Sequence, residues 1–327
     1  MANTRPAPTT PPSTLAVLAR PFDVAVPDDG YAWWYLDAFS DDGRHAITVI
    51  AFVGSVFSPY YARARRRRPT DPRRHCALNV ALYGRPGARW AMTERSLGAL
   101  SRTAACFAIG PSALAWENDA LVLRLDEIAV PLPRRIRGQI RLFPRSVPAA
   151  PIALDSDANH YWQPLAPLSR VEVELDTPRW SWQGHGYLDA NHGRVPLERT
   201  FTGWHWARCR LSETETVLGY DVEELSGEQR QFALRCTPSL SESTQALPRQ
   251  PLRATGWGIA RSGFGDAGTS TRVVRTLEDT PFYARSEVAA TVHGQAATLM
   301  HESLDLRRFS RRWVQALLPF RMPRRGD

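Results

Sequence analysis

The chain has 327 residues, 43% of them hydrophobic, which is enough to bury one large core or two moderate ones and excludes a disordered protein. Its formal net charge of +8 at pH 7 comes from arginine, because the sequence contains no lysine, so a single arginine carries little functional weight. The 4 cysteines form no Cys-x-x-Cys pair, which gives no indication of a zinc or redox site and fits a reducing compartment.

The N-terminal segment, residues 1–20, is rich in proline and threonine and lacks the apolar stretch of a signal peptide. We therefore expect a disordered leader there. The longest apolar run, residues 46–57, is well short of the ~20 residues that a membrane-spanning helix needs. The sequence accordingly predicts a cytoplasmic protein without a signal peptide or a transmembrane helix.

Most of the remaining chain alternates between apolar and polar residues with the period of a β-strand. The Asp41-Asp42-Gly43 turn predicts a hairpin, and Asn118-Asp119 predicts another turn. The expected strands lie at 31–40, 44–54, 75–84, 113–133, 136–144, 169–178, 216–225, 230–236 and 271–277. Many short strands with almost no helical periodicity predict an all-β fold of barrels or sandwiches.

A weak internal repeat suggests how the chain divides into domains. An aromatic pair followed by a polar turn and a strand occurs twice, once from Trp33 and once from Trp204. We therefore expect two β-domains, residues 21–195 and 196–327. The aromatic-rich run at 179–198 would then lie at their junction, which is a common place for ligand sites.

The C-terminus departs from the strand pattern, since residues 306–318 have the period of an amphipathic helix that ends at Pro319. One arc of this helix carries Leu306, Phe309, Trp313, Ala316 and Leu317, and the other carries Arg307, Arg308, Arg311 and Arg312. Two interpretations stay open: a helix that packs against a barrel, or a helix that lies in a membrane interface with its arginines on the headgroups. Arginines are also concentrated at 63–74, which indicates either a solvated loop or a surface for phosphates.

A carboxylic acid among aromatic residues is the main candidate for chemistry. If residues 186–191 are extended, Tyr187, Asp189 and Asn191 project from one face, with His185 beside them and Trp180 and Trp182 just before. Burial among rings would raise the pKa of Asp189 and make it a proton donor near neutral pH. The alternative is an ordinary turn aspartate beside core tryptophans.

His160 and Trp162 share a strand face and are expected to border the same cavity, although a single histidine of this kind is more often a hydrogen-bonded core residue. Other chemistries lack a motif: no glycine-rich nucleotide loop, P-loop or Gly-x-Ser-x-Gly elbow is present. The basic clusters lack interleaved aromatic residues, so nucleic acid is not an expected partner.

Several long motifs resemble the carotenoid 1,2-hydratase family, also called hydroxyneurosporene synthase. They are "WWYLDAFSDDGRHAITVIAFVGSVFSPYYARAR", "DPRRHCALNVALYG", "RWAMTER", "VPLPRRIRGQIRLFP", "HYWQPLAP" and "GHGYLDANHGRVPLERTFTGWHWARC". The resemblance covers roughly residues 20–240. It implies two lipocalin-like β-barrel or β-sandwich domains with a cavity near their junction, followed by the short amphipathic helix.

The resemblance also implies an activity: addition of water to the terminal C1–C2 double bond of an acyclic carotene such as neurosporene or lycopene, without a cofactor or metal. The family's His-x-Trp and Tyr-x-Asp pairs correspond here to His160 and Trp162 and to Tyr187 and Asp189. Further candidates for contact with substrate are Trp182, His185, Trp204 and Trp206. Because carotenes reside in membranes, we expect peripheral contact with lipid through the arginine-rich C-terminal helix. The alternatives are a non-catalytic carrier of a hydrophobic isoprenoid and a pericyclase or isomerase on the same scaffold.

Overall fold

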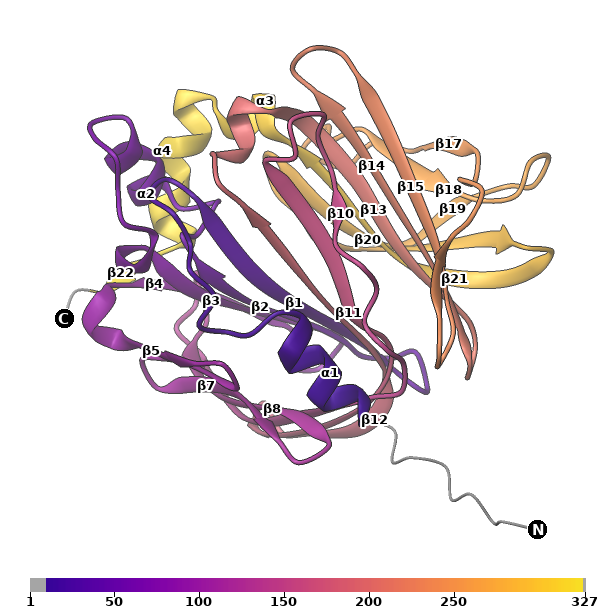
Figure 1. Cartoon of the computed structure of the whole chain (residues 1–327), viewed down its shortest axis with the longest axis horizontal. Helices are drawn as coiled ribbons and strands as arrows, with labels where there is room; N and C mark the ends of the chain where they lie inside the picture. Colours follow the sequence, from indigo (N-terminus) through magenta and orange to yellow (C-terminus); the bar gives the residue numbers. More distant parts are fainter. Residues whose placement is uncertain (1–9, 326–327) are drawn as a thin grey trace, which may run out of the picture.

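The computed structural model describes residues 10–325, and these fold mainly into two large sheets that pack face to face (Figure 1). Their strands are antiparallel except for the short parallel pair of β22 and β4. The first sheet has the order β22-β4-β3-β2-β1-β12-β11-β9-β8-β7-β6-β5, and β10 pairs with β11. Its strands are β1 (Tyr31–Ser40), β2 (Ala46–Val53), β3 (Cys76–Tyr83), β4 (Arg89–Arg95), β5 (Leu100–Thr103), β6 (Cys106–Ile109), β7 (Ser112–Glu117), β8 (Ala120–Ile128), β9 (Arg135–Pro144), β10 (Ile152–Ala153), β11 (His160–Thr177), β12 (Trp180–Gly193) and β22 (Arg324–Arg325). The predicted all-β class is confirmed.

The second sheet has the order β16-β15-β14-β13-β21-β20-β19, and a separate hairpin pairs β17 with β18. The strands are β13 (Phe201–Ser212), β14 (Glu215–Glu224), β15 (Gln229–Cys236), β16 (Ser241–Ser243), β17 (Arg249–Leu252), β18 (Arg261–Phe264), β19 (Arg272–Asp279), β20 (Tyr283–Val292) and β21 (Gln295–Asp305). The chain passes from the first sheet to the second between Gly193 and Phe201, and β22 then returns to the first sheet. The division into domains at residue 195 stays a prediction.

Short helices connect or cover the sheets. They are α1 (Pro12–Ala19), α2 (Pro59–Arg65), α3 (Leu306–Phe309) and α4 (Arg312–Arg321), with 3-10 turns η1 (Pro72–Arg74), η2 (Leu97–Ala99) and η3 (Leu197–Arg199). Within residues 10–325, none of the helices combines the length and the apolar character that crossing a membrane requires.

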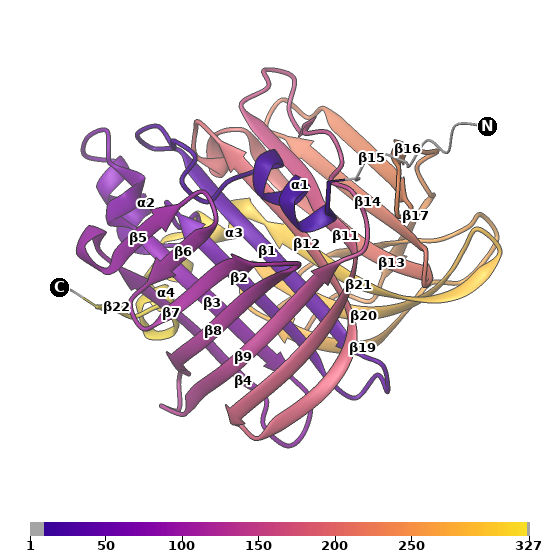
Figure 2. The same cartoon turned by 60° about the horizontal axis from the view of Figure 1, so that its bottom comes forward.

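Alternation along the central strands creates two cores on the two faces of the first sheet. In β1, Trp34 and Leu36 point into an inner core, which the curled sheet encloses where β6 and β8 approach β3 and β4 (Figure 2). Tyr31, Trp33 and Tyr35 point the other way, into the core between the two sheets. Both faces of β1 are therefore buried, which explains its continuous run of apolar and aromatic residues.

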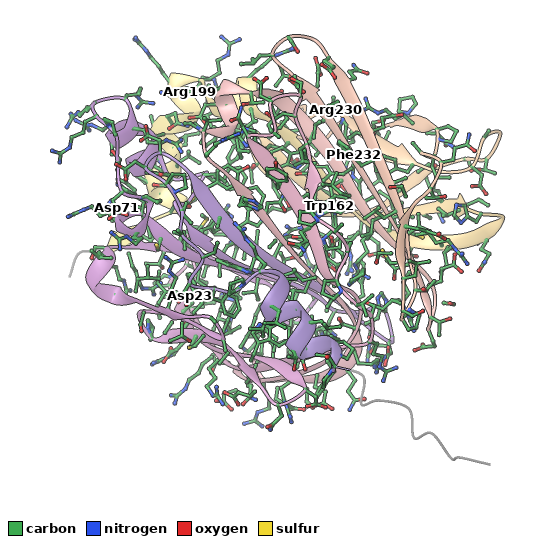
Figure 3. The ribbon with its side chains drawn as sticks, in the orientation of Figure 1. Asp23, Asp71, Trp162, Arg199, Arg230 and Phe232 are labelled. Atoms are coloured by element: carbon green, nitrogen blue, oxygen red, sulfur yellow. The ribbon has the colours of Figure 1, made fainter. Side chains whose placement is uncertain are left out.

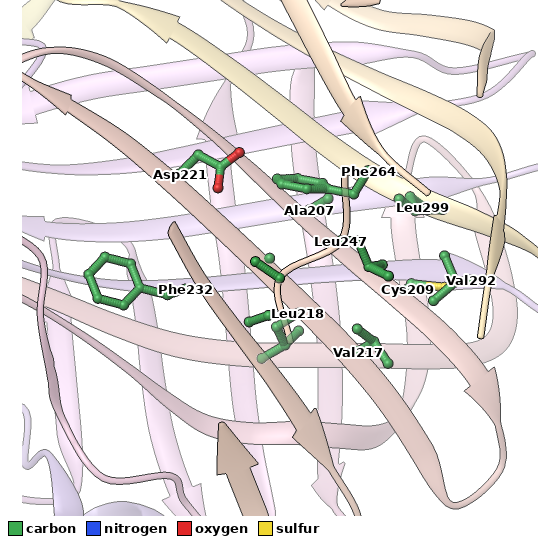
Figure 4. Close-up of a pocket in the computed structure, with 13 residues that line it drawn as sticks. Ala207, Cys209, Val217, Leu218, Asp221, Phe232, Leu247, Phe264, Val292 and Leu299 are labelled. Atoms are coloured by element: carbon green, nitrogen blue, oxygen red, sulfur yellow. The ribbon is translucent and has the colours of Figure 1, made fainter. Parts of the chain in front are cut away.

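The second sheet has a far face, covered by the β17–β18 hairpin. Ala207, Cys209, Val217, Phe264 and Leu299 fill this third core and leave a cavity of only ≈ 20 Å³ (Figure 4). That is about the space for one water molecule, so this cavity is too small for a larger ligand.

The local turn predictions are confirmed. Gly43, with φ of 68°, lies in the connection between β1 and β2, and Asn118, with φ of 54°, lies between β7 and β8. One strand is longer than predicted, because β11 begins at His160 rather than near Ser169. Its prolines are accommodated at the register shifts between Pro164 and Ser169, where the ladder is already interrupted.

The predicted disordered leader is wrong in its second half. Pro12–Ala19 forms α1, and Ala16 is fully buried in the inner core, so burial of an apolar side chain stabilises a segment whose composition alone indicates disorder. Residues 1–9 lie outside the described part of the chain.

The single C-terminal helix predicted for residues 306–318 is also corrected. It is broken into α3 and α4 at Ser310. The side-chain amide of Gln315 donates to the carbonyl of Phe309 at 2.7 Å and so supplies a hydrogen-bond partner for a backbone acceptor at the C-terminal end of α3. Pro319 does not end α4, which continues to Arg321. Val314 and Leu318 are buried, whereas Trp313 and Leu317, which were predicted on the same apolar arc as Leu306, are exposed to 45% and 44%.

Candidate active site

The candidate site lies between the two sheets, on β12 at the centre of the first sheet. The register of β12 against β1 is regular from Gly184 to Gly193, so its side chains alternate strictly between the two faces. Leu188 and Ala190 enter the inner core, and Tyr187 points toward the second sheet. Asp189 and Asn191 share the face of Tyr187, as the alternation predicts.

The Asp189 carboxyl group is held at one oxygen and unpaired at the other. Its Oδ2 accepts hydrogen bonds from the Tyr187 hydroxyl and from the Trp162 indole N–H, both at 2.8 Å. Its Oδ1 is buried and has no hydrogen-bond partner among the described residues. Trp162, from the neighbouring strand β11, lies among the side chains between the sheets (Figure 3).

Burial raises the pKa of Asp189 well above 3.8. The hydrogen bonds from Tyr187 and Trp162 favour the carboxylate and act against this shift, while the negative charges of Glu302 and Asp37 add to it. A buried oxygen without a partner makes the charged form still more costly. The group is therefore neutral over a range of pH in which an exposed aspartate is ionised, with Oδ1 as the oxygen left to carry the proton.

Aromatic rings from both sheets surround this acid. Tyr220 of β14 meets Trp162 edge-on with ring centroids 5.2 Å apart, and Trp206 of β13 lies 5.2 Å from the ring of Tyr187. Tyr35 of β1 completes the group, 5.4 Å from Trp206. The electron-rich faces of such rings attract a cation within about 6 Å.

The tryptophans nearest to Asp189 in sequence do not belong to this group. Trp180 is buried in the inner core, Trp182 packs against that core, and both lie on the opposite face of β12, beside His45. Even-numbered positions of the strand face away from the second sheet, so Trp182 lies on the face opposite Asp189, and its contact with substrate stays a prediction. Trp204 and Trp206, by contrast, lie in the core between the sheets.

The ring of His160 is hydrogen-bonded to residues other than Asp189. Its Nδ1 is 2.8 Å from the Tyr31 hydroxyl, and its Nε2 is 2.9 Å from the Thr200 hydroxyl. Burial lowers the pKa of His160 to about 4, so the ring is neutral at pH 7. It pairs with Gly193, four residues along β12 from Asp189, which corresponds to about 13 Å of strand.

His185 belongs to a second polar cluster on the same face. Its Nδ1 is 3.2 Å from the Arg208 guanidinium, which also donates to Asp37 at 2.9 Å. Arg208 and Asp37 are buried, and His185 is partly buried. Burial, and then the charge of Arg208, lower the pKa of His185. Since Asp37 is on β1 and Arg208 is on β13, this ion pair ties the two sheets together.

Sequence reasoning missed Tyr35 and Tyr220 because both reach the site through long-range contacts. Tyr35 pairs with Asp189 across β1 and β12, and Tyr220 packs on Trp162 from the second sheet. Alternation from Tyr31 does place Tyr35 on one face of its strand, and "GYD" marks Tyr220 in a strand, but neither pattern identifies the partner strand. Among residues 10–325, no three His, Cys, Asp or Glu side chains lie together in an arrangement that could hold a metal ion.

Comparison with solved structures supports the fold. A crystal structure of a Nitrosomonas europaea protein aligns with a TM-score of 0.63 at 14% identity, covering 93% of this chain and 98% of that one. Kievitone hydratase from Nectria haematococca aligns with a TM-score of 0.53 at 9% identity, covering 88% and 97%. At these identities the likeness concerns the architecture alone, and it agrees with the predicted lipocalin-like fold.

Sequence comparison is more specific. The chain is 52% identical over 307 residues to an acyclic carotenoid 1,2-hydratase of Thiocapsa roseopersicina, covering 93% of this chain and 76% of the relative. It is 48% identical to the enzyme of that name from Rubrivivax gelatinosus, with the same coverage, and 37% identical to that of Cereibacter sphaeroides, of which it covers 98%. The family model described as carotenoid hydratase CrtC matches residues 49–327. The chain therefore belongs to the carotenoid hydratase family CrtC, whose members are hydro-lyases.

Proposed function

We propose that the protein adds water to the terminal C1–C2 double bond of an acyclic carotene, such as neurosporene or lycopene, without a cofactor. The observation that carries this proposal is the buried Asp189 carboxyl group, fixed through Oδ2 and unpaired at Oδ1. An alkene is a very weak base, so its protonation needs an acid that stays neutral and lies away from water. Asp189 has both properties.

The first step transfers the Asp189 proton to C2. The electron pair of the double bond forms the new C2–H bond and leaves a tertiary cation at C1, while Asp189 becomes a carboxylate. The hydrogen bonds from Tyr187 and Trp162 to Oδ2 then strengthen, because bonds to an ionised acceptor are roughly twice as strong as neutral ones. These two donors therefore stabilise the charge that proton transfer creates.

The second step captures the cation with water. The oxygen of water bonds to C1, and its surplus proton returns to Asp189, which gives the tertiary alcohol and restores the acid. Until then the rings of Tyr187 and Trp206 stabilise the cation by about 0.5–2 kcal/mol each. A further buried donor without a partner among the described residues, Trp206 Nε1, is suited to hold the attacking water.

His160 has a positioning role in this scheme. Its ring bridges Tyr31 of β1 and Thr200, just ahead of β13, and so fixes the end of the strand that carries Trp162. With its low pKa and its distance from Asp189 it does not supply the proton. The site thus lies at the junction of the two units that we propose, residues 21–195 and 196–327.

The Asp189→Asn variant tests the acid role. It retains an oxygen that accepts from Tyr187 and Trp162 but has no proton to give, so we expect folding with loss of at least a thousandfold of the hydration rate on lycopene. Leu240→Ala, a change at an exposed leucine, is the control and should keep full activity. A folded Asp189→Asn protein that still hydrates lycopene would refute the acid role.

We also propose that α4 docks on anionic lipid. Beside its buried residues it exposes Trp313 and Phe320, the latter to 77%, and Trp257 stacks on Trp313 with centroids 6.2 Å apart. Helix α2 lies against α4, which brings the exposed arginines of the 63–74 segment to the same end of the molecule (Figure 1). Apolar rings within a basic surface are typical of interfacial binding.

Co-sedimentation with anionic vesicles tests this docking. Phe320→Glu should reduce the bound fraction severalfold, and higher salt should reduce it further, because headgroup attraction is screened. Leu240→Glu, at another exposed leucine, is the matched control. Equal binding of both variants and the parent protein would contradict docking through α4.

A further inference from the structure

A second apolar cavity lies beside the candidate site, between the first sheet, the β19–β20 turn and α4. Its volume is ≈ 300 Å³, far larger than the cavity in the third core. Its lining includes Ile50 and Phe52 of β2, Met92 of β4, Phe282, and Leu318 of α4. Most of these side chains belong to the core between the two sheets.

The strand register places this cavity in line with Asp189. Asp189 of β12 pairs with Tyr35 of β1, Tyr35 pairs with Ile50 of β2, Ile50 pairs with Asn79 of β3, and Asn79 pairs with Met92 of β4. Directly paired residues point to the same face of a sheet. Asp189, Tyr35, Ile50, Asn79 and Met92 therefore form one row across the strands, and its last three members line the cavity.

The inner end of the cavity is close to the acid. Ile50 is two strands from Asp189, about 10 Å at the usual strand spacing, and only Tyr35 stands between them in the row. Arg285 lines the cavity, is paired with Glu302, and lies 5.6 Å from the ring of Tyr35. Tyr35 thus separates the apolar cavity from the buried acid.

The outer end of the cavity opens at exposed apolar residues. Trp257, Leu317 and Phe320 line it and are exposed to 47%, 44% and 77%. A cavity of this size is at the lower end of the range for ligand sites, so it encloses only part of a long hydrocarbon. The remainder of such a chain would leave through this apolar mouth.

We infer that this cavity binds the polyene chain of the substrate, which lies across the strands with its reacting end directed past Tyr35 toward Asp189. The inference rests on the proposed function, since it takes the acyclic isoprenoid as the ligand. It assigns α4 as one wall of the binding site. It also predicts selectivity for long chains, because contacts in the cavity and at its mouth are made only by the part of the molecule remote from the reacting double bond.

Lycopene binding to the Asp189→Asn protein in detergent micelles tests the assignment, because in that protein the ligand is not consumed. Leu317→Arg places a charge at the mouth, and Ile50→Trp fills the inner end. We expect each change to raise the Kd for lycopene, measured by quenching of tryptophan emission, at least tenfold. Leu240→Arg, at an exposed leucine outside the cavity lining, should leave binding within twofold of the parent.

Turnover provides a second readout. With an otherwise unchanged sequence, Leu317→Arg should lower the ratio of kcat/KM for lycopene to that for a C15 acyclic isoprenoid at least tenfold. If Ile50→Trp fails to fold, as judged by its circular dichroism, Leu317→Arg carries the test alone. Unchanged lycopene binding and an unchanged ratio in Leu317→Arg would overturn the assignment.

These experiments distinguish failure of the cavity assignment from failure of the proposed hydratase activity. Hydration of lycopene by the unaltered protein, with binding unaffected in the cavity variants, contradicts the cavity assignment and leaves the activity intact. Binding that depends on Leu317 and Ile50, in a protein that never forms the alcohol, supports the cavity and contradicts the hydratase mechanism.

Discussion

The surroundings of Asp189 determine its protonation state and hence whether it can donate a proton. A carboxyl group in water loses its proton near pH 4, which would leave no acid at neutral pH. Burial raises its pKa, and the two donors are both directed at Oδ2, so the neutral state persists with a free oxygen. The same donors then favour the carboxylate once the proton has left.

The raised pKa of Asp189 predicts the pH dependence of activity. The protonated form is the active one, so kcat/KM should be highest below the pKa of Asp189 and fall tenfold per pH unit above it. Because burial moves that pKa upward, the fall should occur well above the pH at which an exposed aspartate ionises. The measurement is a pH profile of lycopene hydration. A rate that increases as Asp189 loses its proton would contradict the assignment.

At the scale of elements, β12 depends on glycine at its end. Gly193 lies between Tyr31 and His160 in the register, and a Cβ there would approach within 2.6 Å of both the His160 Nδ1 and the Tyr31 ring. Glycine therefore allows two side chains on flanking strands to meet over the middle strand. The last glycine of the sequence run 179–198 has a packing role that its spacing alone does not reveal.

Gly193→Ala should accordingly break the contact between Tyr31 and His160. Forcing an extra methyl group into a filled site costs about 1–3 kcal/mol of unfolding free energy, measured by urea denaturation. Replacing His160 removes one of the two clashes. The loss of unfolding free energy in the double variant His160→Ala, Gly193→Ala should therefore be smaller than the sum of the losses in the two single variants. Simple additivity would show that the glycine does not serve this contact.

The local pattern predicted the strands, the turns after Ser40 and Glu117, and the face of β12 that carries Tyr187 and Asp189. It did not predict that β12 pairs with β1, nor that the rings around Asp189 come from β13 and β14, because alternation fixes a face but not a partner. Trp182 was grouped with Asp189 because the two are close in sequence, whereas strand alternation places it on the opposite face. The break at Ser310 follows from capping and packing that helical periodicity does not contain.

At the scale of the whole molecule, the two sheets are joined by one apolar core and by the buried pair of Asp37 and Arg208. Arg208→Met leaves Asp37 buried without its partner and should lower the unfolding free energy by about 3–5 kcal/mol. Adding Asp37→Leu removes the unpaired charge, so the double variant should recover much of that loss. Urea denaturation measures both.

An exposed ion pair gives the matched control. Arg124 and Glu117 have side chains exposed to 53% and 42%, so Arg124→Met should change the unfolding free energy by no more than about 1 kcal/mol. If Arg208→Met lowers the unfolding free energy no more than Arg124→Met does, the buried pair does not hold the sheets together.

The most direct test of the account is incubation of the purified protein with lycopene in water labelled with ¹⁸O, without oxygen and without added cofactor. We predict a tertiary alcohol at C1 that carries one ¹⁸O atom, formed by the unaltered protein and absent with Asp189→Asn. Bound but unchanged lycopene, as a carrier would give, or a rearranged product without the label, as an isomerase would give, would contradict the proposed hydration.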